Sequence, residues 1–456
     1  MSLKIEARNT TKLALPIIFG ELAQMLLHII DTAMIGATGP ESYKQVAAAA
    51  LALSVINIPF VLGIGITISV SQLVSMAKGK GDDKAISHYL YNGFWICAVS
   101  AVVISLGIEG GQNILFHLGQ DEEVAKLALP FLRVMGLSIV PMLLFMTLKQ
   151  FTDGLEYTRT AMVLSVLSLP INIFINWLLV FGNLGFPRME MVGAAYGTLI
   201  TRSLIFVVLA YVILTHRIYK PYISLRKEQW QLKWTSIKEL LTIGIPSSLQ
   251  IGLEAGVFAV SGIIVGSMGG GGKQLAAHQV ALQCASFTFM VSMGLAQAGS
   301  IRVSNAFGQG KWSKISAIGK STFLLALCYG VLCALLFVVF RHVLPIAFLH
   351  NQSEGNAEVI MIAANLLLLA GIFQIFDATQ VISAGLLRGI KDVKFPTVLV
   401  FVAYWVLGLP VGYWLAKTFN LQASGIWWGF IIGLAFSSIS LTKRFLNKLK
   451  SNATVS

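Results

Sequence analysis

Four polar side chains recur along one face of the apolar segment GELAQMLLHIIDTAMIG, residues 20–36. They are Glu21, Gln24, His28 and Asp31, spaced i, i+3, i+7 and i+10. At about 100° per residue these positions fall within an arc of roughly 80°, so a helix would carry them as one polar stripe. Two acids and an imidazole on a helix otherwise built from Leu, Ile, Met and Ala predict a face that looks onto protein or water rather than lipid.

Asp31 is the member of this stripe best suited to carry chemistry. A carboxylate in a partly dry cavity can take up or release a proton near neutral pH, or it can ligate Na⁺. The alternative is structural: Asp31 lies only five residues before Gly36, so it could reach the membrane interface and be solvated. The sequence leaves both interpretations open.

Three further ionisable residues, Arg202, Glu254 and Asp377, lie inside apolar segments. Each such group costs at least about 2.5–3.5 kcal/mol at a helix centre on insertion scales, so it needs a reason to be there. Glu254 and Asp377 are each the only acid in their segment, and they predict a proton site or a Na⁺ site with these two acids as ligands. The alternative is that both carboxyls are protonated and form separate interhelical hydrogen bonds.

Arg202 and the first-segment acid Glu21 lie at comparable depths when counted from the expected helix ends. Because an arginine side chain is long enough to bridge the remaining difference, we expect a structural Glu21–Arg202 ion pair. The alternative is an arginine that reaches toward the interface without a fixed partner.

Neutral polar residues in other segments add to the candidate site. Asn172 and Asn176 in PINIFINW lie one turn apart on one helix face, where they could line a site or only hydrogen-bond between helices. Asp153, next to a glycine, is expected to make turn or cap interactions. His278 is expected to be a hydrogen-bonded histidine between helices.

The elements that must position these residues are membrane helices. The chain has 456 residues, of which 56% are hydrophobic and only 12% charged, far less charge than globular domains carry. Apolar runs of about 20 residues recur from end to end, and each is long enough to span a bilayer as a helix. We therefore predict an all-α polytopic membrane protein with about twelve transmembrane helices. The expected spans lie near Leu13–Gly36, Val46–Ala77, Leu90–Ile108, Ala128–Leu148, Ala161–Phe181, Val192–Leu214, Leu241–Gly266, Leu275–Phe307, Ile318–Phe340, Val359–Leu386, Thr397–Ala416 and Gly425–Phe445.

The formal net charge of +13 is explained by the orientation of the chain in the membrane and does not indicate a nucleic-acid partner. Most of the 33 Lys and Arg residues fall at alternate ends of the expected spans. By the positive-inside rule, this places both termini in the cytoplasm and supports an even number of spans. We expect the lipid bilayer, and no nucleic acid, as the macromolecular environment.

Segments on either side of a polar stretch at residues 215–239 resemble each other. QVAAAALAL (45–53) matches QLAAHQVAL (274–282) at an offset of 229, and Pro16 matches Pro246 at an offset of 230. This offset relates helices that enter from the same side, so the repeats are parallel. We predict two six-helix lobes, residues 1–220 and 240–456, joined by a cytoplasmic linker at 221–239 and related by a pseudo-two-fold axis along the membrane normal.

No motif for ATP binding or catalysis is present. GSMGGGGKQ (266–274) lacks the first glycine and the Ser or Thr of a phosphate-binding loop, and nothing resembles a metalloprotease helix or a nucleophile elbow. We therefore expect a protein that is not an enzyme and has no cofactor, and transport that is driven by an ion gradient.

Nine segments spread over the whole chain carry a family resemblance. They are IIDTAMIG, AAAALALSV, FTDGLEYTRTAMV, NIFINWLLVFG, MVGAAYGT, LAAHQVAL, SIRVSNAFGQGKWSK, FDATQVISAGLLRGIKD and YWVLGLPVGYWLA. Together they resemble the multidrug and toxic compound extrusion (MATE) family, in its NorM-type bacterial branch. The resemblance implies a monomer in a bacterial inner membrane that exports cationic or amphipathic drugs in exchange for H⁺ or Na⁺.

The resemblance also implies site residues. In the first lobe it places Asp31 with Asn172, Asn176 and Thr198, and in the second lobe it implies a cation site of Glu254 and Asp377. Where NorM-type proteins can have a tyrosine four residues before the second acid, this chain has Phe373, which removes a phenol oxygen as a cation ligand. Three other candidates, Glu21, His28 and Arg202, are not family hallmarks and are expected to tune the substrate or the coupling ion. Together with Gln24 of the stripe they complete the coupling residues expected in the first lobe.

Two other classes of function compete with drug antiport. A flippase for lipids or lipid-linked oligosaccharides, from the same larger superfamily, should line its cavity with several arginines or lysines to match a pyrophosphate; here only Arg202 qualifies. A membrane sensor or scaffold should show no dye flux.

Overall fold

The computed structural model describes residues 3–39, 42–117, 122–223, 230–268, 272–348 and 354–453. Every regular element in these ranges is helical, and twelve of the helices are long and apolar enough to cross a membrane. The prediction of an all-α polytopic protein with about twelve spans is confirmed.

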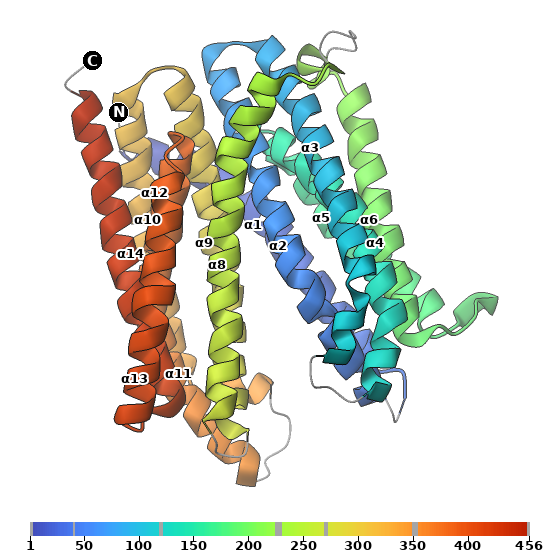
Figure 1. The fold of residues 1–456 in the computed structure, drawn as a ribbon. Coiled ribbons are helices and arrows are strands. Elements are labelled where there is room, and N and C mark those ends of the chain that lie inside the picture. Colours follow the sequence, from blue (N-terminus) through green and yellow to red (C-terminus); the bar gives the residue numbers. More distant parts are fainter. Residues whose placement is uncertain are drawn as a thin grey trace. The chain divides into compact units, whose positions relative to one another are not determined.

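Long helices, joined by short connections, make up most of the chain (Figure 1). The helices of the first half are α1 (Leu3–Gly36), α2 (Ser42–Lys80), α3 (Asp83–Gly110), α4 (Glu122–Gly154), α5 (Thr158–Leu179) and α6 (Glu190–Thr215). Those of the second half are α8 (Trp234–Ser267), α9 (Lys273–Gly308), α10 (Trp312–Phe340), α11 (Glu354–Gly389), α12 (Lys394–Phe401), α13 (Leu409–Thr418) and α14 (Gln422–Ala453). Short 3₁₀ turns lie at Gln112–His117 (η1), Asn183–Gly185 (η2), Lys220–Tyr222 (η3) and Leu344–Ala347 (η4).

Some helices extend beyond the apolar runs that predict them. α4 continues to Gly154 rather than ending near Leu148, so residues 149–154 are helical. α8 begins at Trp234, within the stretch expected to be a linker. Of that linker, residues 224–229 lie outside the described residues, as do residues 269–271 of the glycine-rich segment.

The helices pack into two compact units. The N-terminal unit, Phe19–Ser248, has a core that includes Phe131 and Ile139 of α4. The C-terminal unit contains Met1–Ile18 and Leu249–Ser456, and α14 contributes large buried side chains to its core. Because α1 and α8 each contribute residues to both units, the units do not divide at the polar linker, and the lobe boundaries given above stay a prediction.

A π-helical segment, η5 (Val402–Gly408), joins α12 to α13 within one span. π-helical turns inside α-helices occur often at functional sites. Here the segment buries Tyr404 and directs Trp405 toward α8, where its Nε1 donates to the backbone oxygen of Leu253 at 3.1 Å. The irregular turn therefore adds a phenol to the interior of the C-terminal unit.

The start of α1 is attached to α9 inside the C-terminal unit. Arg302 Nη1 donates to Glu6 O at 2.8 Å and to Thr10 Oγ1 at 2.6 Å, and its Nη2 forms an ion pair with the Glu6 carboxylate. Glu6 is only 2% exposed. Arg302 therefore supplies the positive charge that this buried acid requires.

Replacement of this arginine tests the attachment. We expect Arg302→Gln to lower the stability of the purified protein by about 1–3 kcal/mol, because Glu6 is left buried without its cation. Thermal unfolding in detergent measures the loss. The control is Lys320→Gln, an exposed lysine of α10, which should change stability by less than about 0.5 kcal/mol. Equal stability of the two variants would contradict the assignment.

Candidate functional site

Asp31 lies at the centre of a buried hydrogen-bonded cluster in the N-terminal unit. Its Oδ1 accepts from Asn176 Nδ2 at 2.6 Å, and its Oδ2 accepts from Thr198 Oγ1 at 2.6 Å. Asn172 completes the cluster: its Oδ1 accepts from Asn176 Nδ2 at 3.1 Å, and its Nδ2 lies 3.5 Å from Thr198 Oγ1. The structure thus brings together residues of α1, α5 and α6 that the sequence analysis assigned to one site.

A glycine on α6 makes room for this arrangement. A Cβ atom at Gly197 would overlap Asn176 Oδ1, so any larger residue would force the asparagine away. Because Asn176 is fully buried and donates to Asp31, its position decides how the carboxylate is held. Asp31 itself is 9% exposed, which excludes the alternative of a solvated interfacial acid.

Arg202 lies one helical turn beyond Thr198 on α6 and is 4% exposed. Its Nη1 donates to Ser138 Oγ at 2.7 Å, whereas its Nε has no hydrogen-bond partner among the described residues. Arg202 acts electrostatically on Asp31 and on His28 without an ion-pair contact to either. It is therefore a buried positive charge beside the Asp31 cluster, not an arginine extended to the interface.

The expected Glu21–Arg202 ion pair is wrong. Glu21 Oε1 lies 2.9 Å from Lys149 Nζ, and the same Nζ lies 3.4 Å from Asp153 Oδ2. All three side chains are at most 10% exposed. The prediction failed because α4 was expected to end before Lys149; its longer course buries that lysine opposite α1. Asp153 accepts the turn hydrogen bond from Glu156 N at 2.8 Å through its backbone oxygen, as expected of a turn residue, and its side chain forms in addition the buried ion pair with Lys149.

The polar stripe of α1 therefore serves two clusters at different depths. Glu21 belongs to the lysine cluster and Asp31 to the amide cluster, and the two are ten residues apart on one helix. Between them lie Gln24, whose Nε2 is buried without a partner among the described residues, and the half-buried His28. The stripe faces protein within the N-terminal unit, as its composition predicts.

Glu254 of α8 is the centre of a second cluster, in the C-terminal unit. Its Oε1 accepts from Gln380 Nε2 at 2.8 Å and from Gln250 Nε2 at 3.3 Å. Both donors are neutral amides, and no ion pair to Glu254 occurs within the part of the chain that the structure describes.

Asp377 of α11 adds a second acid to this cluster. It is 4% exposed, and its charge and that of Glu254 act on each other. Its Oδ2 has no hydrogen-bond partner among the described residues, and the same holds for Gln374 Oε1, three residues earlier on α11. Gln374 instead donates to Ala285 O and Thr288 Oγ1 of α9 through its Nε2. Two buried acceptor oxygens without donors are suited to a proton or a small cation.

Tyr404 is a member of this cluster that the sequence analysis did not single out. It is 1% exposed, and both Glu254 and Asp377 act electrostatically on its hydroxyl. Phe373, by contrast, packs into an aromatic cluster, with its ring centroid 5.5 Å from that of Trp427. A phenol is thus present near the two acids, but it comes from η5 instead of position 373. Its signal in the sequence is a tyrosine inside an apolar span.

His278 is held between three helices, as expected. Its Nδ1 accepts from Trp427 Nε1 at 3.1 Å, and its Nε2 lies 3.2 Å from Ser261 Oγ. Because a tryptophan N–H can only donate, Nδ1 carries no proton and the imidazole is neutral. This histidine is structural, and the expectation is confirmed. No group of three or more His, Cys, Asp or Glu side chains arranged to hold a metal ion occurs in the described ranges.

Twelve candidate spans among the described residues define a polytopic helical membrane protein, and buried carboxylates without ion-pair partners inside such spans are typical of transporters. A family model described as MatE matches residues 16–178 and 246–414 of the chain. The chain therefore belongs to the MatE family of membrane transporters, and the resemblance seen in the sequence is confirmed. The two matches begin at Pro16 and Pro246, the prolines paired by the internal repeat.

Relatives of known name cover nearly the whole chain. A protein of Agrobacterium fabrum, named probable multidrug resistance protein NorM, is 34% identical over 446 residues, which are 97% of this chain and 94% of that protein. Multidrug resistance protein MdtK of Yersinia pseudotuberculosis is 32% identical over 445 residues, 96% and 95% of the two chains.

Solved structures show the same fold at lower identity. The eukaryotic MATE transporter AtDTX14 is 21% identical, with a TM-score of 0.88 over 99% of this chain and 98% of that one. An outward-facing multidrug resistance MATE family transporter is 18% identical, with a TM-score of 0.88 over 98% and 97%. The similarity extends over essentially complete chains.

The lysine cluster gives a testable prediction about stability. We expect Lys149→Gln to destabilise the protein by about 3–5 kcal/mol, because Glu21 and Asp153 then stay buried without a cation. The double variant Glu21→Gln/Lys149→Gln should recover part of this loss, since it removes a charge of each sign. Thermal unfolding of the single and double variants in detergent measures the coupling. Strictly additive losses would show that the three residues do not act as a unit.

Proposed function

We propose that the chain is a secondary active multidrug antiporter that exports cationic or amphipathic compounds in exchange for H⁺ or Na⁺ by alternating access. The family and the names of the relatives support efflux transport. Ion coupling is supported by one observation: some acids inside the spans form ion pairs with a lysine or arginine, and others do not.

The acids inside the spans fall into two groups. Glu6, Glu21 and Asp153 each have a lysine or arginine nitrogen within ion-pair distance. Asp31 and Glu254 accept only from neutral amides and a hydroxyl, and no ion pair to either, or to Asp377, occurs among the described residues. Arg202 acts electrostatically on Asp31 and Arg388 acts on Glu254, but neither arginine forms an ion pair with its acid among the described residues. Carboxylates compensated so weakly are suited to bind a proton or a cation from outside. The second group is therefore the exchange group.

At Asp31 the proposed coupling is electrostatic. The ionised carboxylate attracts a drug cation or Na⁺, whereas a proton removes that charge, so the bound states exclude each other. Asn176 and Thr198 hold the two oxygens in place and stabilise the ionised form by donating to it. The nearby positive charge of Arg202 partly offsets the negative charge of the Asp31 cluster. A cation at Asp31 is therefore held more weakly and can exchange.

In the C-terminal unit we propose that Glu254 and Asp377 bind the coupling cation. Gln374 Oε1 and the Tyr404 phenol can contribute neutral oxygens, and hard cations such as Na⁺ prefer oxygen ligands. Phe373 supports this site only through packing, because its ring has no oxygen and is surrounded by other aromatic rings.

The remaining elements of the proposal come from the sequence. Both termini face the cytoplasm of a bacterial inner membrane, since the basic residues cluster at the corresponding helix ends. The lobes 1–220 and 240–456 move relative to each other during transport, and the protein works as a monomer. We assign no flippase activity, because Lys149 is neutralised by two acids, and the two other interior arginines, Arg202 and Arg388, each lie near an acid, Asp31 and Glu254 respectively.

Dye efflux from inverted membrane vesicles, under an imposed proton gradient or an imposed Na⁺ gradient, tests the exchange group. We expect Asp31→Asn to abolish ethidium transport. Glu254→Gln and Asp377→Asn should reduce it at least tenfold. Each substitution removes a carboxylate that, in the proposal, binds different cations in turn. The control is Glu358→Gln, an acid 56% exposed and paired with Lys273, which should transport normally. Normal transport by Asp31→Asn, or transport that ignores both gradients, would refute the proposal.

Gly197→Ala tests the geometry of the Asp31 cluster without removal of a charge. The new Cβ would displace Asn176 from Asp31, so we expect transport to fall at least tenfold. Gly107→Ala is the matched control, because a Cβ there meets no atom within 4 Å. Both proteins should unfold cooperatively in detergent. Wild-type transport by Gly197→Ala would show that the position of Asn176 does not matter.

A further inference from the structure

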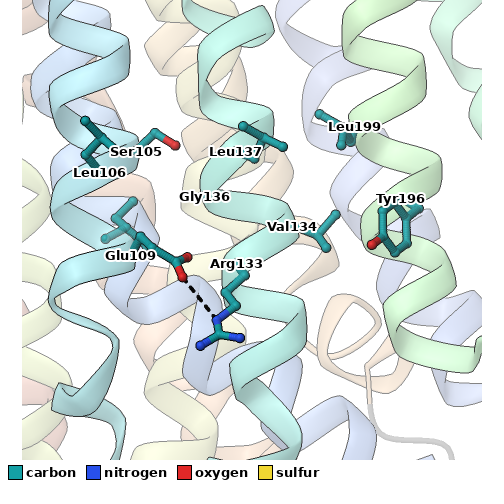
Figure 2. Close-up of a pocket in the computed structure, with 10 residues that line it drawn as sticks. Ser105, Leu106, Glu109, Arg133, Val134, Gly136, Leu137, Tyr196 and Leu199 are labelled. Atoms are coloured by element: carbon teal, nitrogen blue, oxygen red, sulfur yellow. Dashed lines mark ion pairs between the residues drawn. The ribbon is translucent and has the colours of Figure 1, made fainter.

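A groove on the N-terminal unit lies apart from both buried clusters. Residues of α3, α4 and α6 line it, and its volume is about 320 Å³, within the range of about 300–1,000 Å³ that is typical of ligand pockets. Figure 2 shows Arg133 and Glu109 at one end and Leu106, Leu137 and Leu199 toward the other. None of these residues belongs to the candidate site.

The polar end of the groove coincides with the ends of the helices. Glu109 is in the last turn of α3, which ends at Gly110, and its Oε1 lies 3.2 Å from Arg133 Nε of α4. The same Nε donates to Gln112 Oε1 at 2.8 Å, in the turn η1 that follows α3. The ion pair therefore lies where α3 leaves the apolar layer, at the level expected for lipid headgroups.

The other end of the groove is apolar and lies deeper along the same helices. Leu106 precedes Glu109 by about one turn, and Leu137 follows Arg133 by about one turn, each roughly 4.5–6 Å toward the middle of the span. These leucines are 65% and 54% exposed. Gly136 supplies part of the floor: a Cβ there would lie 3.1 Å from Ile108 Cγ2, so the glycine allows the close approach of α4 to α3.

The charges at the polar end restrict the ligand. Arg133 and Glu109 are 55% and 50% exposed, so both can contact a ligand at the surface of the protein. Arg133 makes its contacts through Nε, and its two terminal nitrogens have no hydrogen-bond partner among the described residues. These N–H groups suit a phosphate, and the Glu109 carboxylate suits an adjacent primary ammonium. A net-neutral pair disfavours an anionic headgroup, and a trimethylammonium group cannot donate to Glu109.

We propose that this groove binds a zwitterionic phospholipid with a primary-amine headgroup. The phosphate contacts the Arg133 guanidinium, the ammonium contacts Glu109, and an acyl chain lies along Leu106 and Leu137. This inference does not depend on drug export or ion coupling. With both termini in the cytoplasm, as proposed, the end of α3 would lie in the outer leaflet, and only this assignment rests on that orientation.

Native mass spectrometry of the purified full-length protein tests the proposal. The protein is released from detergent after equilibration with equal amounts of a phosphatidylethanolamine, a phosphatidylcholine and a phosphatidylglycerol. We expect phosphatidylethanolamine to give the most abundant lipid adduct. Arg133→Gln should lower its bound fraction about threefold or more, as expected for loss of an accessible charge contact. Glu109→Gln should lower it relative to phosphatidylcholine.

Two further variants separate the groove from general surface charge. Val134→Trp keeps both charges but fills the groove, and it should reduce phosphatidylethanolamine binding as much as Arg133→Gln does. Lys126→Gln removes a lysine at the same end of α4 that pairs with the exposed Glu122, and it should leave binding unchanged. Thermal unfolding confirms that each variant is folded.

Several outcomes would overturn the proposal. One is an equal bound fraction of phosphatidylethanolamine in the wild type, in Arg133→Gln and in Val134→Trp. Another is a decrease in Lys126→Gln as large as that in Arg133→Gln. A third is displacement of the lipid by ethidium at the concentration that supports transport. The last result would make the groove a drug site. Because no outcome depends on transport activity, the lipid site and the proposed antiport can fail independently.

Discussion

A carboxylate placed inside a membrane requires a compensating positive charge, and the interior of this protein is arranged around that requirement. Ionised groups without a partner are costly in a medium of low polarity, so each buried acid must be paired, protonated or occupied by a cation. The chain meets the requirement in two ways. Lys149 and Arg302 form ion pairs with one set of acids, and we propose that the other set binds ions from outside.

This division links packing to function. The fixed pairs join helices: Lys149 ties α4 to α1 in the N-terminal unit, and Arg302 ties α9 to the start of α1 in the C-terminal unit. The acids without fixed cations are instead surrounded by neutral donors, which orient a carboxylate without cancelling its charge. Asn176 is the clearest case, because a glycine on the facing helix is needed to place it. Helix α1 thus carries both an acid in a fixed ion pair, Glu21, and an acid held by neutral donors, Asp31.

Much of this could be predicted from the sequence, because membrane helices impose strong patterns. The twelve spans and the stripe on α1 follow from run length, periodicity and the cost of buried charge, whereas the association of Asp31 with Asn172 and Asn176 came from the family resemblance. The partner of Glu21 could not be predicted, because it depends on whether α4 ends before or after Lys149, and the ends of apolar runs do not fix helix ends. Tyr404 was missed for a related reason: it lies in a π-helical turn, and one apolar segment cannot reveal such a turn.

The most direct test of the central claim is a count of the ions exchanged when a drug binds. Isothermal titration of the purified protein with ethidium, in buffers of different ionisation enthalpy and with or without Na⁺, gives the number of protons released and the Na⁺ dependence of affinity. The account predicts release of protons or competition by Na⁺ in the wild type. This response should be lost in Asp31→Asn and retained in Glu21→Gln. Ethidium binding with neither response, or a response abolished by Glu21→Gln and unaffected by Asp31→Asn, would contradict it.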